Sequence, residues 1–100
     1  MSTTPELFIT QFMEDIVNKY PDLMAVYGYE AFDDTHYVEF FPTEVYEKYD
    51  ALVDEEVGTM IAFENQFRGH SLVTFSGEDL LEVRNPIVTR KGKSYDLSRK

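Results

Sequence analysis

The chain has 100 residues, of which 43% are hydrophobic, so it is long enough for one core and too short for two ordinary domains. It has no cysteine, which excludes disulfides, thiolate metal sites and a cysteine nucleophile and is typical of a reducing compartment, so we expect a cytoplasmic location. The net charge of −10 exceeds what solubility alone requires, and the absence of a basic leader or a long apolar run predicts neither export nor membrane insertion.

The first predicted element is a helix that begins at Thr3 or Thr4, because a threonine can cap the first turn and Pro5 is tolerated there. Apolar residues then recur at spacings of three and four, which places them on one helix face; they are Phe8, Ile9, Phe12, Met13, Ile16, Val17 and Tyr20. Pro21 ends the helix. We expect this stripe to pack in the core rather than against a partner helix.

A β-hairpin is predicted next. Segments 23–32 and 36–41 are rich in aromatic and β-branched residues, and they flank Asp33, Asp34 and Thr35, which are residue types that favour a tight turn. In the second arm the side chains alternate between two faces, so one face can meet a helix.

Three tyrosines of the predicted hairpin are candidate contacts for a protein partner, since exposed aromatic rings are favoured anchors in interfaces. Tyr27 and Tyr29 fall on the same strand face by parity, and Tyr37 lies across from them if the turn is centred near Asp34. The alternative is that the three rings form a half-buried ladder that stiffens the sheet.

A second helix is predicted to begin at Thr43, with an apolar stripe that continues to Gly58. At that glycine the pattern has two interpretations: the helix runs on to Gly69, or it stops and a second short helix begins with Thr59 as its cap. We favour the break, because an interior glycine costs about 1 kcal/mol relative to alanine.

The last third of the chain changes to strand periodicity. Strands are predicted at 71–76 and 80–84, and 87–90 is expected to pair at a sheet edge. The order α-β-β-α-(α)-β-β-(β) predicts an α+β fold, a two-layer sandwich with the helices packed on one face of a mainly antiparallel sheet. We assign residues 1–90 to this single domain and residues 91–100 to a basic, mobile C-terminal tail.

The sequence contains no recognisable catalytic or cofactor motif, because its five glycines stand too far apart for a phosphate-binding loop or a dinucleotide fingerprint. His36 follows Asp33 and Asp34, so these side chains could share a cation or a proton, but the acids also suit a turn for structural reasons. His70 follows a predicted helix end, where a histidine can interact favourably with the last backbone carbonyls of the helix. We therefore predict no catalytic residue, no metal and no cofactor, and a protein that is not an enzyme.

The strongest functional signal is acidity. Residues 1–67 carry 15 acidic and two basic side chains, whereas residues 68–100 carry four acidic and seven basic ones. Six acids are predicted to make the exposed face of the second helix negative; they are Glu44, Glu47, Asp50, Asp54, Glu55 and Glu56. The leading hypothesis is a non-catalytic protein-interaction module whose working surface is this acidic face together with Tyr27, Tyr29 and Tyr37, and whose partner is a basic protein.

A second hypothesis is an acidic inhibitor of the phage or immunity type, which imitates the phosphates of a nucleic acid and blocks a basic enzyme. Direct nucleic-acid binding by the body of the domain is disfavoured because its charge repels phosphate. The simpler alternative to both hypotheses is a solvated acidic face, and the sequence leaves the oligomeric state open.

Overall fold

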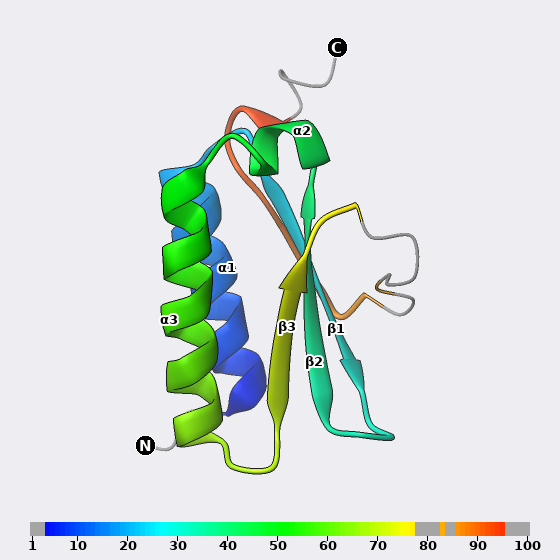
Figure 1. The fold of residues 1–100 in the computed structure, drawn as a ribbon. Coiled ribbons are helices and arrows are strands. Elements are labelled where there is room, and N and C mark those ends of the chain that lie inside the picture. Colours follow the sequence, from blue (N-terminus) through cyan, green and yellow to red (C-terminus); the bar gives the residue numbers. More distant parts are fainter. Residues whose placement is uncertain (1–3, 78–82, 84–85, 96–100) are drawn as a thin grey trace.

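The computed structural model describes residues 4–77, 83 and 86–95 (Figure 1). Within these ranges the chain forms three helices and four strands, which are, in chain order, α1 (Pro5–Lys19), β1 (Met24–Glu30), β2 (Thr35–Phe41), α2 (Thr43–Tyr46), α3 (Asp50–Gln66), β3 (Ser71–Phe75) and β4 (Val88–Lys91). None of the helices in this described part combines the length and the apolar character that crossing a lipid bilayer requires.

The strands form one sheet in the order β3-β2-β1-β4. β1 is antiparallel to both of its neighbours, β2 and β4, whereas β2 and β3 are parallel. The parallel pair arises because α2 and α3 carry the chain from the end of β2 back to the start of β3, and parallel strands need such a long connection. The predicted α+β two-layer fold is confirmed, with a sheet that is mixed rather than purely antiparallel.

Four of the predicted strands are present in the structure, with bounds that differ by one or two residues. Segments 23–32 and 71–76 contain β1 and β3, segment 36–41 covers β2 except for Thr35, and segment 87–90 contains most of β4, which pairs with β1 at one edge. The strand predicted at 80–84 lies largely outside the described residues.

The two long helices lie side by side on one face of the sheet (Figure 1). α1 contacts β1 and β4, and α3 contacts β3. The core lies between the layers; its most deeply buried residues are Ile9, Met13, Leu23, Ala25, Tyr27, Val38, Phe40, Leu52 and Phe63. The prediction that the stripe of α1 packs inward is confirmed, because Ile9, Phe12, Met13, Ile16 and Val17 are all buried.

The predicted start of α1 is also confirmed. Thr4 is the N-cap, and its hydroxyl accepts a hydrogen bond from the backbone N–H of Leu7 at 3.1 Å, which satisfies one of the free donors of the first turn. Pro5 occupies the first turn, as expected.

The break predicted at Gly58 is wrong. The helical segment is interrupted earlier, between α2 and α3, and Gly58 lies inside α3. Tyr49 fixes this earlier break through tertiary contacts, because its hydroxyl donates to Asp22 at 2.8 Å and its ring packs on Tyr20 with centroids 4.4 Å apart. The cost of an interior glycine is offset by the buried side chain of Phe63 further along the same helix, since full burial of such a side chain contributes about 1.5–3 kcal/mol.

The segment that follows β4 differs from the predicted tail. The N–H of Gly92 donates to the carbonyl of Leu23 at 2.8 Å, and the N–H of Ser94 donates to the carbonyl of Pro21 at the same distance. Tyr95 is only 2% exposed. Residues 91–95 are thus packed on the domain, whereas residues 96–100 lie outside the described residues.

Candidate functional site

The predicted acidic row is not one continuous exposed surface. Glu44, Glu47, Asp50 and Asp54 are exposed, as expected. Glu56 is only 3% exposed, and both of its carboxylate oxygens lie 2.9 Å from the hydroxyl of Tyr46, which donates to them. Burial raises the pKa of Glu56 above its usual value. The prediction that Glu56 belongs to an exposed face is therefore wrong.

Glu55 is also engaged inside the protein, at the seam between α1 and α3. One oxygen accepts from the Lys19 ammonium at 2.8 Å, and the other accepts from the Tyr20 hydroxyl at 2.7 Å. The hydrogen bond from Lys19 lowers the pKa of Glu55, and the hydrogen bond to Glu55 raises the pKa of Tyr20 to about 12. The role that these contacts support for Glu55 is to join the two helices.

The inward turn of Glu56 follows from the position of the helix break. Because α3 begins anew at Asp50, its helical register places Leu52, Glu56 and Phe63 on the side that faces the sheet. The apolar stripe predicted to continue to Gly58 included Val53 and Val57, which were expected to face inward. These valines lie on the outside of the helix.

An exposed apolar row runs along α3 as a result. Val53, Val57 and Ile61 are 54, 46 and 59% exposed, and their spacing of four residues places them one above another on the helix surface. Asp54 and Glu64 are exposed on the same helix, so the row is accompanied by negative charge. We call Val53, Val57 and Ile61 the apolar row of α3.

The apolar row points away from α1. Glu55 and Thr59 mark the side of α3 that faces α1, since Glu55 binds Lys19 and Thr59 lines a groove with α1 residues. Successive helix residues are about 100° apart, so Val57, two positions from each of them, lies on the opposite flank. α1 lies over the β1–β4 side of the sheet and α3 over β3, so the row faces the β3 edge.

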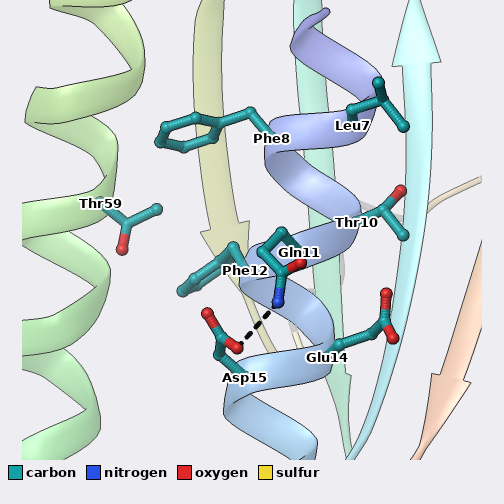
Figure 2. Close-up of a pocket in the computed structure, with 8 residues that line it drawn as sticks. All are labelled: Leu7, Phe8, Thr10, Gln11, Phe12, Glu14, Asp15 and Thr59. Atoms are coloured by element: carbon teal, nitrogen blue, oxygen red, sulfur yellow. Dashed lines mark hydrogen bonds between the residues drawn. The ribbon is translucent and has the colours of Figure 1, made fainter. Parts of the chain in front are cut away.

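The groove between α1 and α3 has a volume of about 520 Å³ (Figure 2). Leu7, Phe8 and Phe12 supply its apolar lining, and Gln11 donates to Asp15 across one helical turn at 3.0 Å. The carboxylates of Glu14 and Asp15 also line the groove, beside its apolar side chains.

The two histidines meet at the start of β3. Nε2 of His36 lies 2.9 Å from Nδ1 of His70, and Nδ1 of His36 lies 2.6 Å from the hydroxyl of Tyr27. His36 is almost fully buried, and burial, followed by the nearby His70, lowers its pKa from 6.5 to about 4. The hydrogen bond between the two rings links β2 to the residue before β3.

This pair differs from both sequence interpretations of the histidines. The Asp34 carboxylate accepts from the Tyr29 hydroxyl instead of joining His36, and His70 bonds to His36. The sequence analysis missed the pair because only the parallel pairing of β2 with β3 brings the two residues together. No group of three or more metal-ligating side chains occurs among the described residues.

The three hairpin tyrosines do not form one exposed ladder. Tyr27 and Tyr29 share the face that meets the helices, which confirms the parity argument, but Tyr27 is buried and only Tyr29 is exposed. Tyr37 pairs with Gly28 and therefore lies on the other face of the sheet, which contradicts the prediction that it lies across from them. Tyr27 is thus not accessible to a partner.

Comparisons with protein-family models, curated proteins and solved structures found no match to this chain. Its function is therefore inferred from its own surface.

Proposed function

We propose that this protein is a non-catalytic protein-interaction module that binds a basic partner through the outer flank of α3. The observation that carries the proposal is the apolar row of α3, in which three large side chains each stay about half exposed. Contiguous exposed apolar surface with a polar rim is typical of protein-binding sites.

Neither helix propensity nor core packing explains why the three residues of the row are apolar. Val53, Val57 and Ile61 are β-branched residues, which have lower helix propensity than the alanine or glutamate that an exposed helix position favours. They also lie outside the set of buried core residues. A contact that covers them would remove this apolar area from water, which favours association.

The charges around the row define the chemistry of the partner. Asp50, Asp54 and Glu64 are exposed on α3, and the net charge of the chain is −10. Exposed acids attract a partner that carries lysine or arginine, and they oppose the approach of a second copy of this chain. The partner that fits is a basic protein with apolar side chains at the centre of its contact surface.

The same arrangement supports the interaction module over an inhibitor that imitates nucleic acid. Such a mimic works through charge alone, and it needs a continuous row of exposed carboxylates. On α3, Glu55 and Glu56 turn toward the protein, and apolar side chains occupy the neighbouring outer positions.

Co-purification from the source cell tests the proposal. The double variant Val57→Asp with Ile61→Asp places two charges on the apolar row, and Ile87→Asp is the matched control because Ile87 is 50% exposed and lies next to β4. We expect the double variant to lose the partner that the wild type and the control retain. High salt should weaken this complex without abolishing it, because apolar contacts are not screened.

A measurement of the thermal midpoint accompanies the capture. All three proteins should unfold within a few degrees of one another, because the substituted side chains are exposed. If the folded double variant captures the same partner as the wild type, the outer flank of α3 is not the binding surface.

A further inference from the structure

β3 is an open edge of the sheet. It pairs with β2 on one side, and none of the described residues pairs with its other side. The N–H of Ser71 points toward β2, since it donates to the carbonyl of Asp34 at 3.1 Å. Backbone groups alternate in direction along a strand, so the N–H and C=O groups of Leu72 and Thr74 point outward.

This edge lacks the features that normally protect an edge strand from pairing. Natural sheets guard their edges with lysine, proline, bulges or very short strands. The five residues Ser71–Phe75 contain no charged residue, proline or glycine, and valine, threonine and phenylalanine all favour extended structure. β3 therefore presents a regular backbone that can accept another strand.

The apolar row of α3 lies on the same side of the molecule as this edge. Figure 1 shows α3 and β3 together at one end of the two layers, with α1 behind α3. An added strand would lie about 4.8 Å beyond β3, beneath the flank of α3 that carries Val53, Val57 and Ile61. Every second side chain of that strand would point toward the apolar row.

We propose that β3 is the docking site of an extended segment of the partner, in which apolar and basic side chains alternate. The segment pairs its backbone with Leu72 and Thr74 and places its apolar side chains on the apolar row of α3. This inference rests on the proposed function and specifies its binding mode, which is strand addition. The net charge of −10 attracts a basic segment and opposes the β3 edge of a second copy of this acidic chain.

Amide hydrogen exchange with a synthetic probe tests the inference. The probe is a nine-residue peptide, blocked at both ends, in which lysine and valine alternate. We expect the peptide to slow the exchange of the Leu72 and Thr74 amides by about tenfold or more, because free edge amides gain a hydrogen bond. The Ser71 and Val73 amides should change far less, since they already face β2.

A second peptide of the same composition distinguishes strand addition to β3 from binding to the α3 surface in another conformation. Its valines stand at spacings of three and four, so they can share one face only in a helical conformation and not in an extended strand. If this peptide binds and shifts the NMR signals of the apolar row without protecting Leu72 and Thr74, strand addition is overturned while the α3 surface remains the site. If neither peptide protects these amides, strand addition is likewise overturned, and the co-purification experiment still decides the proposed function.

Two further measurements complete the test. Val57→Asp should weaken binding of the alternating peptide at least about tenfold, whereas Ile87→Asp should leave it unchanged; equal binding by Val57→Asp contradicts the proposed packing on α3. Sedimentation of the free protein tests the remaining alternative, that a second copy of this chain pairs with the edge. If the Leu72 and Thr74 amides are protected without peptide in a dimer, a second copy occupies the edge and the inference is wrong.

Discussion

The two edge strands of the sheet, β4 and β3, differ in charge and in packing. β4 carries Arg90 and Lys91 within its four residues, and the chain that follows it bonds to the carbonyls of Leu23 and Pro21. β3 contains no charged residue, but buried polar side chains of neighbouring elements contact it. One of these is Glu56, which bonds to Thr74 and Tyr46.

This difference indicates how a sheet can keep one edge available for binding. Charge and close packing protect the β4 edge, and neither depends on the ionisation of a buried group. No described residue pairs with the outer side of β3, and this strand is anchored by the His36–His70 hydrogen bond and by Glu56. Burial shifts the pKa values of His36 and Glu56, so their ionisation affects stability. The stability of the β3 side should therefore respond to pH more than that of the β4 side.

The largest effect should come from removing the segment that follows β4. A chain that ends at Lys91 loses the hydrogen bonds of Gly92 and Ser94 and the buried ring of Tyr95, and loss of one such ring alone costs about 3–5 kcal/mol. Chemical denaturation of this truncation, compared with one that ends at Tyr95, isolates the contribution of residues 92–95. Equal midpoints would mean that these contacts contribute nothing to stability.

A glycine at the end of β4 gives the next largest effect. A Cβ atom at Gly92 would lie 2.1 Å from the carbonyl oxygen of Pro21, so Gly92→Ala should lower the free energy of unfolding by about 3 kcal/mol. Gly58→Ala is the matched control, because no atom lies within 4 Å of its added Cβ and alanine is the better helix former. The control should raise stability by about 1 kcal/mol. Similar losses in the two variants would contradict the close approach at Gly92.

On the β3 side we predict a pH effect from His36. Its pKa is about 4 when folded and 6.5 when unfolded, so between these values the unfolded chain binds more protons and stability falls as the pH falls. The loss should amount to about 2 kcal/mol between pH 6.5 and pH 4, after allowance for partial solvent screening. Unfolding of the wild type and of His36→Phe should show this slope only in the wild type.

An NMR titration checks the same prediction without a substitution. The ring signals of His36 should not shift until the pH approaches 4. Titration of His36 near pH 6.5 would contradict the lowering of its pKa by burial.

The smallest effect should come from Glu56. Its pKa is raised when folded, so the folded protein binds this proton more tightly than the unfolded chain does, and the stability linked to that proton is lost as the pH rises through the raised pKa. Glu56→Gln imitates the protonated form and can still accept a hydrogen bond from Tyr46, so it should raise stability by about 1 kcal/mol at pH 7. The gain should vanish at low pH. A loss at pH 7 would mean that the Glu56 charge is stabilising.

Local signals in the sequence predicted much of this fold. The cap at Thr4, the strand alternation in β1 and β2 and the turn near Asp34 each depend on neighbouring residues only. Asp34 itself has a positive φ of 52°, which aspartate tolerates better than most residues.

The candidate site was harder to predict, because it depends on where α3 begins. The break before α3 has no glycine or proline at its centre and is fixed by the contact of Tyr49 with Asp22 and Tyr20. A shift in that starting point rotates the whole helix about its axis. Glu56 is then buried, and Val53 and Val57 are exposed. Contacts between residues far apart in sequence, such as His36 with His70, leave no local signal.

The order in which the strands are paired has a consequence for synthesis of the chain. β1 and β2 are neighbours in sequence, but β3 reaches β2 only after α3, and β4 reaches β1 across about two thirds of the chain, as in the pair Met24 and Lys91. Distant pairing carries a larger entropy of loop closure. β4 is translated after every other strand described here, so the nascent domain holds the β1 edge unpaired until Lys91 has left the ribosome. Among the strands described here, the β1 edge, which is uncharged from Met24 to Tyr27, is therefore exposed during translation, and the charged β4 edge takes its place afterwards.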